Sequence, residues 1–563
     1  MSCPKQTILL QYSINFLHLI YNADPYQLKL NLNPISMRKI LTSVTAVLIT
    51  GSLFAGGLVT NNNHSALFTR LQNRNASTSV DAVYFNPAGV IMLGDGFFAS
   101  VNNQTISQTQ IVTSNYASIA GRPKEYIGKV SAPLFPAIYA AYNTGNFSFS
   151  AGFNPIGGGG GAEYADGLPS FESMVSDIPP SLTFRGIPTS QYDADIFFEG
   201  SSVYFGYQVN VGYKISDMIS VAAGMRLVSA KNTYSGYLRN IRINPNYPAF
   251  GAGYTGGMVR ADEFFSDGSD FMTTLATGAN TAAAGLNAAI SGGTPAGTPL
   301  TALPAQTVAA VTQLLGAAQI SAAGMTVGQA AAALEDDAAP LFTGMALDMA
   351  INSAMTEDIE VDAEESGTGF TPILSVNIAP SENLNLSLRY EFRTKMDLTT
   401  KVNGNLGGGL FEDGYEVPGD MPAMLALGAE YKPMENLMVA ASFNTFFDKA
   451  IDYDGSQEDD IDMIDKNFLE YGLGAEYGLS EKLRISAGWS ATSVGVENSY
   501  QSDMRFDINT NTFGGGFGYR VTPKIDLNLG GQYTFYKEES IGTETFDKKT
   551  WLIGIGADFF FGK

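Results

Sequence analysis

The chain has 563 residues, of which 45% are apolar and only 15% are charged. Soluble domains carry roughly 25% charged residues, so a conventional soluble surface is scarce here. No segment approaches the ~20 consecutive apolar residues of a membrane helix, which excludes a polytopic helical membrane protein. The net charge of −23 argues against nucleic acid as a partner. Two His and one Cys leave little material for zinc or thiol chemistry, so no metal, cofactor or catalytic site is expected.

The N-terminal region has the three parts of a secretory signal. A basic start at residues 37–39 is followed by an apolar run up to Phe54, and Ala55 is a small residue suited to cleavage. The run is too short to span a membrane comfortably. We therefore predict a signal peptide over residues 37–55, with a short N-terminal anchor as the alternative. Residues 1–36 show no usable pattern and are expected to be an upstream extension.

From residue 96 onward, apolar residues alternate with small or polar ones over long segments, which is the period of a β-strand. In residues 525–535, Ile, Leu, Gly, Tyr and Phe occupy one face, and Asp, Asn, Gly, Gln and Thr occupy the other. Residues 384–393 alternate in the same way. A soluble sandwich alternates too, so the period alone does not identify a membrane protein.

The connections between these segments fall into two sets. One set is short and similar in composition, whereas the other is long, variable and either acidic or Gly-rich. Short turns at one end, long loops at the other, strands of ~10 residues or more and aromatics near the turns are typical of an outer-membrane barrel. The short turns are residues 213–217, 379–383, 431–436, 477–482 and 519–524.

The sequence predicts an all-β transmembrane protein, an antiparallel barrel of about fourteen strands over residues 96–561. An even number lets the barrel close with both ends on the periplasmic side, and closure removes the open edges that lipid cannot hydrogen-bond. The expected strands are 96–112, 133–144, 146–157, 201–214, 217–245, 366–380, 383–402, 422–433, 436–454, 467–479, 482–501, 506–521, 524–538 and 548–561. The last should point Trp551, Ile553, Ile555, Ala557, Phe559 and Phe561 outward.

Residues 56–95 precede the first strand and are too polar and irregular to span a membrane. Within them, residues 83–89 read Val-Tyr-Phe-Asn-Pro-Ala-Gly. At this distance from the signal, the segment resembles the start of the FadL-type long-chain fatty acid transporters of Gram-negative outer membranes, in which an N-terminal hatch bearing Asn-Pro-Ala plugs a fourteen-stranded barrel. The layout of the whole mature chain is similar to that family. The candidate hatch motif is Asn86, Pro87, Ala88 and Gly89, where Pro restricts the preceding residue and the small residues permit close packing.

The resemblance implies a passive transporter for a hydrophobic small molecule, such as a long-chain fatty acid. The ligand is caught at the extracellular mouth, enters the lumen and triggers movement of the hatch; some relatives take up aromatic hydrocarbons instead. We expect a monomer in contact with outer-membrane lipid, without enzyme activity. Two alternatives stay open: a surface adhesin-like barrel that binds a partner through its large outer loop, and a general porin for hydrophilic solutes.

The chain departs from that family at residues 246–365, an Ala-rich connection far longer than a barrel loop needs. Residues 326–329 have capping-box spacing, and apolar residues recur at helical spacing on both sides of them. By strand parity this loop is extracellular, so we expect a partly helical cap. Phe342, Met345 and Met349 are candidates for first capture of an apolar ligand, because Met adapts to irregular shapes. Alternatively, they pack the core of the cap itself.

A carboxylate ligand needs a cationic partner in the lumen. By alternation, Arg226, Arg389 and Arg393 face inward, and Arg offers a bidentate fork for a carboxylate. They are candidate ligand-binding residues on this argument alone and are not carried over from the family. The alternative is an internal ion-pair ladder that stiffens the barrel, for example Arg389 or Arg393 with Glu391 and with Glu430 on the neighbouring strand.

Two further features have more than one interpretation. The Gly run at residues 157–161 lacks the strand-to-helix context of a nucleotide site and is expected to begin a loop over residues 158–200, with a kink that opens the barrel wall. The acidic runs at residues 357–365 and 458–462 suit either divalent ions or a solvated acidic rim.

Overall fold

The computed structural model describes residues 65–404, 411–451 and 463–562. The expected signal peptide, the upstream extension, the first nine residues of the hatch and the second acidic run lie outside these described residues. Within the described ranges, no helix is both long and apolar enough to cross a membrane.

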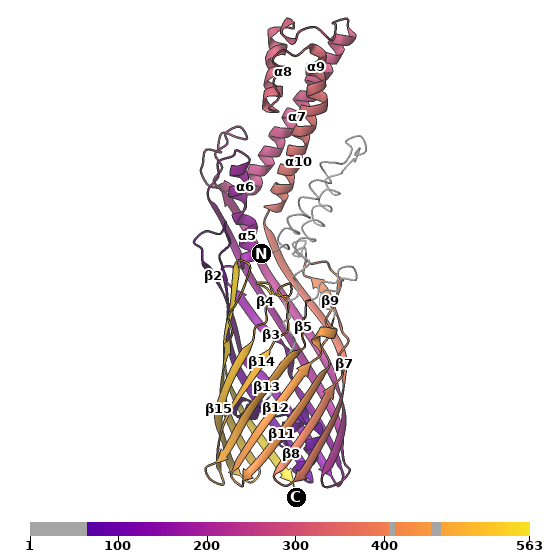
Figure 1. The fold of residues 1–563 in the computed structure, drawn as a ribbon, viewed down its shortest axis with the longest axis vertical. Coiled ribbons are helices and arrows are strands. Elements are labelled where there is room, and N and C mark those ends of the chain that lie inside the picture. The colour runs from indigo at the N-terminus through magenta and orange to yellow at the C-terminus, as the bar shows by residue number, and fades with distance from the viewer. Residues whose placement is uncertain (1–64, 405–410, 452–462, 563) are drawn as a thin grey trace. The chain divides into compact units, whose positions relative to one another are not determined.

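An antiparallel sheet closes into a barrel (Figure 1). In the described part of the chain it has eighteen strand segments that form fourteen strands, as predicted, because β9, β10 and β17 extend β8, β11 and β16 and β6 is a two-residue addition beside β5. The barrel closes where β1 pairs with β18 in one unbroken register. The segments are β1 (Gly96–Ser114), β2 (Lys124–Thr144), β3 (Phe147–Tyr164), β4 (Tyr192–Lys214), β5 (Ile219–Ile243), β6 (Val259–Arg260), β7 (Ile359–Ser381), β8 (Leu384–Glu391), β9 (Asp397–Val402), β10 (Glu416–Pro418), β11 (Met424–Met434), β12 (Leu437–Phe446), β13 (Phe468–Gly478), β14 (Leu483–Ser493), β15 (Thr510–Thr522), β16 (Ile525–Tyr536), β17 (Glu539–Ile541) and β18 (Glu544–Gly562).

The outer face of the barrel is apolar, and the predicted alternation is confirmed. In β18, Trp551 and Ile553 are exposed while Leu552 between them is buried. Large aromatic side chains gather on the outside near the short turns, as expected at a membrane interface. They are Phe147, Tyr213, Tyr431, Tyr477, Tyr519 and Phe561. The chain is therefore a β-barrel of the outer-membrane type, with both barrel ends at the end of the short turns, which is the end expected to be periplasmic.

Several strands begin earlier than predicted on the extracellular side. Lys124, Tyr192 and Ile359 open β2, β4 and β7, where the sequence pattern predicts loops. Beyond the membrane both faces of a strand can be polar, so apolar alternation fades although backbone pairing continues. Ion pairs between strands then replace apolar contacts, as between Lys231 of β5 and Glu364 of β7 at 2.7 Å.

Two strands are shorter than predicted. β12 ends at Phe446 and β14 at Ser493, eight residues before their expected ends in both cases. After β14, the Asn509 side chain accepts the N–H of Val494 at 2.8 Å. Because this side chain takes the place of a backbone partner, the ladder stops there and the loop begins.

Helices occupy the hatch and three extracellular connections. In the large insertion, α7 and α10 pack side by side (Figure 1). The predicted capping box is confirmed, since Thr326 and Gln329 make both reciprocal bonds at the start of α9. The helical segments are α3 (Ala66–Leu71), α4 (Ala82–Phe85), η1 (Pro87–Leu93), α5 (Pro169–Ser176), α6 (Ile178–Phe184), α7 (Ala261–Ser291), η2 (Leu300–Ala302), α8 (Ala305–Ala317), α9 (Val327–Ala332), η3 (Ala333–Ala338), α10 (Ala339–Met355) and η4 (Asp448–Ala450).

The lipid-facing surface gives a test of the barrel. Ile555 is 54% exposed at the middle of the outward face of β18. Replacing it with Arg should destabilise the barrel by about 2–4 kcal/mol, because lipid does not solvate the charge. Urea titration of protein folded into lipid vesicles measures this. The control Glu539→Arg, in the extracellular hairpin, should change stability by less than about 1 kcal/mol. Equal costs at both positions would contradict the membrane orientation.

Candidate functional site

The hatch is fixed inside the barrel by a buried arginine. All six residues of α3 are buried, and Arg70 lies in its last turn. Arg70 Nε donates to Asn528 Oδ1 of β16 at 3.0 Å, and Arg70 Nη1 pairs with Glu476 of β13. Removing one partner of such a buried ion pair costs about 3–5 kcal/mol, so this helix is strongly anchored to the wall.

A surface of inward-facing glycines receives this anchored part of the hatch. A Cβ atom at Gly488 would lie 2.2 Å from the Leu71 carbonyl oxygen, and one at Gly530 would lie 2.6 Å from the Arg70 nitrogen. Any larger residue would therefore displace the hatch backbone. We call these residues the glycine cradle; its other members are Gly428, Gly472, Gly474, Gly514, Gly516, Gly554 and Gly556, each close to a hatch residue.

A second buried arginine organises the next turn of the hatch. Arg74 donates to both carboxylate oxygens of Asp81 at 3.0 Å and to Glu430 of β11 at 3.1 Å. Burial disfavours its charge, but Asp81 and Glu430 outweigh that effect and raise the pKa of Arg74. The hatch is thus folded on itself and bound to the wall by the same guanidinium group. Glu430 pairs with this hatch residue, whereas the sequence analysis offered Arg389 or Arg393 as its partner.

The predicted hatch motif lies against the opposite part of the wall. Asn86 Nδ2 donates to Ser77 O at 3.1 Å within the hatch and to Asn377 Oδ1 of β7 at 2.7 Å. The Ala88 carbonyl accepts from Ser220 of β5 at 2.7 Å. A Cβ atom at position 89 would lie 2.2 Å from Asn86 Nδ2, which explains the need for Gly there. Asn86 therefore closes the bend, and Pro87 begins η1.

Arg226 and Arg389 face the lumen as predicted and meet at a hatch residue, Tyr84. Their guanidinium carbons lie 4.9 and 4.8 Å from the centre of the Tyr84 ring. Arg226 makes a bidentate ion pair with Glu391 at 2.6 and 2.9 Å, and Arg389 lies 3.4 Å from the same carboxylate. Arg389 also donates to the Tyr84 carbonyl. This arrangement agrees with the ion-pair interpretation. It also places two cations in direct contact with a single carboxylate, that of Glu391.

Arg393 does not join this group. It lies two residues beyond the end of β8, its side chain is 39% exposed, and it pairs with Asp420. Arg393 lies in the break between β8 and β9, where alternation is a poor guide, and its role in ligand binding stays a prediction.

An apolar cluster lines the lumen directly above the hatch. Gln208 of β4 donates to the hatch carbonyl of Val83 at 2.9 Å, which marks the level of the hatch on that strand. Further along the strands toward the extracellular end, buried apolar side chains from several strands contact the side of the hatch that faces the mouth of the barrel. They include Ala137, Ile156, Tyr204, Val228, Ala230, Met396 and Leu398, together with Val83 and Phe85. A general porin has a polar lumen, so this wall favours apolar ligands.

The backbone ladder between β2 and β3 is interrupted at the same level. Pairing stops after Ile138 with Phe153 and resumes only at Val130 with Ala162. Residues 131–137 of β2 include two prolines, and β3 has Pro155 in this stretch, so three N–H donors are missing. From Pro155 to Gly160, β3 advances five residues while β4 advances three, which bends β3. The expected kink in the wall is confirmed, whereas the loop predicted from residue 158 begins only after Tyr164.

The inner side of the extracellular strand ends carries a second, aromatic cluster. The rings of Tyr234 and Phe411 lie in tilted contact with their centres 4.9 Å apart, and so do those of Phe506 and Phe546. The loop before β15 is tied to α5 because Asp503 accepts the N–H of Ser170 at 2.7 Å. Burial raises the pKa of Asp503. The mouth is thus lined by aromatic side chains in a fixed arrangement.

The three candidate capture residues of the cap differ in their surroundings. Phe342 is 1% exposed and Met349 is 4% exposed, and both belong to the core that α7, α8, α9 and α10 share. Met345 is 38% exposed on α10. Packing of the cap's own core therefore accounts for two of them, and their role in ligand capture stays a prediction.

Three of the six acidic side chains in the run before and along β7 pair with basic side chains. Asp358 contacts Arg260 at 2.8 Å, and Glu364 contacts Lys231. The charges thus form a ladder between β5 and β7. Of the two interpretations of this run, the acidic rim agrees better with the ladder than a divalent-ion site does.

The sequence analysis missed the residues that hold the hatch. Arg70, Arg74 and Tyr84 lie in the segment expected to be the hatch, and nothing in strand alternation addresses a segment without strands. The sequence did contain a signal. Two Arg residues lie in a short polar stretch that must enter a barrel, and buried Arg residues need carboxylate partners. Glu430 and Glu476 are acidic residues at inward-facing strand positions and could have been identified as those partners.

The fold is similar to solved barrels of hydrophobic-compound transporters. A Pseudomonas aeruginosa FadL homologue matches with a TM-score of 0.51 and 12% identity, covering 89% of this chain and 99% of that one. The P. putida toluene transporter TodX matches with 0.46 and 14% over 86% and 95%, and the Ralstonia pickettii toluene transporter TbuX with 0.45 and 13% over 89% and 99%. No protein-family model and no curated protein matches the chain. The first of these likenesses confirms the predicted fold.

The glycine cradle gives a test of hatch placement. Gly488→Val should push α3 out of its seat and make the barrel permeable, because the new side chain overlaps the Leu71 carbonyl. Leakage of a small hydrophilic dye from liposomes measures this, with the circular dichroism of the barrel as a check on folding. The matched control is Gly531→Val, where a Cβ atom meets nothing closer than 3.7 Å. A folded Gly488→Val barrel that stays as tight as the control would refute the cradle.

Proposed function

We propose that the protein carries hydrophobic compounds, of the long-chain fatty acid or aromatic hydrocarbon kind, passively across the outer membrane. The observation that carries this proposal is the coincidence of three features at one level: a hatch that fills the lumen, an apolar cluster on it and a broken ladder beside it. The FadL homologue with the similar fold bears the name of a fatty acid transporter family, which supports the same class of ligand.

In the proposed path, the ligand passes the aromatic mouth and settles on the apolar cluster above Val83 and Phe85. Each methylene that leaves water there contributes about 0.8 kcal/mol, so affinity rises steeply with chain length. The ligand then leaves sideways between β2 and β3, where no backbone hydrogen bonds need to be broken. This route spares a hydrophobic molecule the polar lower half of the lumen.

The hatch divides into a fixed and a movable part in this proposal. Residues around Arg70 and Arg74 are held by buried ion pairs and by the glycine cradle. The segment around Tyr84 is held by hydrogen bonds, one of them from the Arg389 guanidinium to the Tyr84 carbonyl, and by two cation–π contacts, each worth about 0.5–2 kcal/mol. It has no ion pair of its own to the wall in the described residues. A ligand that displaces the Tyr84 ring exposes Arg226 and Arg389, so a carboxylate headgroup can replace the ring as their partner.

The lateral path predicts the effect of repairing the wall. Deleting Gly158 and Gly159 removes the two extra residues of β3, so its register with β4 continues unbroken and β3 straightens toward β2. Uptake of a fluorescent long-chain fatty acid into proteoliposomes should then fall by tenfold or more, because the exit is closed.

The control for this deletion is removal of Ala322 and Ala323 from the link between α8 and α9, which should leave uptake unchanged. Circular dichroism checks that both barrels fold. Undiminished uptake by a folded barrel lacking Gly158 and Gly159 would mean that ligand takes another route, and loss of uptake in both variants would mean that the assay reports damage to the protein.

The role of the lumenal cations predicts a difference between ligand classes. Arg389→Gln should weaken fatty acid uptake at low concentration about fivefold, roughly 1 kcal/mol, and leave a neutral aromatic hydrocarbon unaffected, because only the carboxylate needs the cation. Arg393→Gln is the control, since that residue pairs with Asp420 at the rim. Dye leakage shows whether the hatch has also moved. Equal effects on both ligand classes would assign Arg389 to hatch stability alone.

A further inference from the structure

The outer part of the helical insertion carries no ionisable side chain. Residues 271–334 contain no Asp, Glu, Lys, Arg or His, in a chain with a net charge of −23. The segment comprises most of α7, all of α8 and all of α9. Acidic residues stand directly on both sides of it, at Asp267 and Asp270 before and at Glu335, Asp336 and Asp337 after. We call residues 271–334 the neutral tip.

The neutral tip stands on a firm base. α7 has 31 residues and so a length of about 45 Å, and α10 packs along its first part. At the base, Arg260 pairs with Asp262 and Asp358 at 2.8 Å, and Ser353 donates to the Asp262 carbonyl at 2.8 Å. One continuous apolar core extends from β5 through the hairpin to the tip. The tip is therefore presented at a set distance from the barrel.

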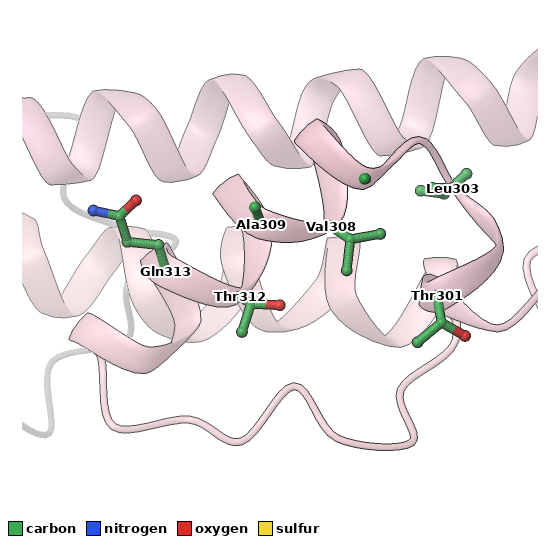
Figure 2. A pocket seen from close by; sticks show the side chains of 7 residues that line it. Thr301, Leu303, Val308, Ala309, Thr312 and Gln313 are labelled. Carbon is green, nitrogen blue, oxygen red and sulfur yellow. The ribbon is translucent and has the colours of Figure 1, made fainter.

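An open hollow lies on the neutral tip (Figure 2). It has a volume of about 580 Å³ and is formed by α8 and the residues that lead into it. Its exposed wall includes Ala309, Thr312 and Gln313, with the partly buried Leu303 and Val308 beside them. The complete lining is Thr301, Leu303, Ala305, Val308, Ala309, Thr312 and Gln313. Small apolar and neutral polar groups thus form a concave face on one helix.

The position and chemistry of the hollow argue against ligand capture for the lumen. The hollow is separated from the strand ends by about half of α7 or more, because Leu314 beside it lies next to Gly278 near the middle of that helix. It contains no aromatic or Met side chain. A charged partner is disfavoured too, because the tip offers no ion pair. A partner with the same neutral helical surface needs no ion pair. Small side chains also let two such helices approach closely.

We propose that the neutral tip binds the neutral tip of a second copy of this chain. Two copies of a strongly acidic protein repel each other wherever their acidic surfaces meet, and two tips can meet without that repulsion. Contact between identical patches is self-complementary, with α8 of each copy lying in the hollow of the other.

The size of the contact indicates where it operates. α8 has 13 residues, so it is about 20 Å long and about 10 Å wide. Two such faces bury well under the ~1,200 Å² of a stable interface, so a single contact is weak. Many copies on two facing membranes engage together and gain avidity. The tip therefore acts between membranes, as a homotypic adhesive contact beside the proposed transport.

Vesicle tethering by the full-length protein tests this inference. Two populations of proteoliposomes, labelled with different dyes, should associate when both carry the wild-type chain, and cross-correlation of the two dyes measures the association. Thr312→Glu should reduce association at least tenfold when both populations carry it, and so should Thr312→Lys, because like charges then face each other. Glu vesicles mixed with Lys vesicles should associate at least as well as wild type.

This crossed rescue distinguishes a second copy from other partners. Ser266→Glu, at the exposed base of α7, is the control and should associate like wild type. Salt should leave the wild-type contact unchanged or stronger and weaken the Glu with Lys contact, since only the latter depends on attraction between charges. Thr312 is remote from the lumen, so fatty acid uptake should be normal in both variants.

Several results would overturn the inference. Wild-type vesicles that stay dispersed would exclude the contact, and association with protein-free vesicles would assign the tip to lipid binding. Association that survives both charged variants would place the contact elsewhere on the protein. Because uptake is measured on the same vesicles, failure of the adhesive contact is distinguishable from failure of the proposed transport.

Discussion

Lipid offers no hydrogen bonds to a backbone, and the structure depends on this constraint throughout. It requires the sheet to close, which it does through the continuous pairing of β1 with β18. A closed barrel of fourteen strands encloses a lumen, and a lumen that is not to leak must be filled. The hatch fills it, and the polar groups on the hatch find their partners on the inner wall.

The same constraint makes the interruption between β2 and β3 informative. Unpaired carbonyl and N–H groups are costly in a membrane, yet the chain places Pro133, Pro136 and Pro155 where the ladder would otherwise continue. Proline removes the donors and thereby reduces the number of unpaired groups. The interruption faces the apolar cluster above the hatch. The wall and the hatch together therefore suit a hydrophobic ligand.

The barrel was predictable from sequence because it obeys a simple period. Alternation identified all fourteen strands, and the short turns gave the orientation. It failed where a strand leaves the membrane, as at Lys124, because both faces of the strand are then in contact with water. The inward direction of Arg226 and Arg389 followed from alternation. Alternation could not identify Tyr84 as their partner, because this contact joins residues that lie far apart in the chain.

The glycine cradle shows the limit of sequence reasoning more clearly. From sequence alone, a glycine within a strand indicates a weakened strand or a β-bulge. Gly488 and Gly530 are instead determined by the hatch backbone that lies against them, and that backbone belongs to a segment with no period of its own. Only the paired register of the strands reveals that these glycines form one surface.

The central claim is that a hydrophobic ligand rests in the lumen above a hatch whose anchored part stays in place. A structure of the protein solved with a long-chain fatty acid tests it most directly. The account predicts elongated density against Tyr204, Val228 and Met396, with Arg70 still paired to Glu476. Ligand density confined to the outside of the barrel, or a lumen emptied of α3, would contradict it.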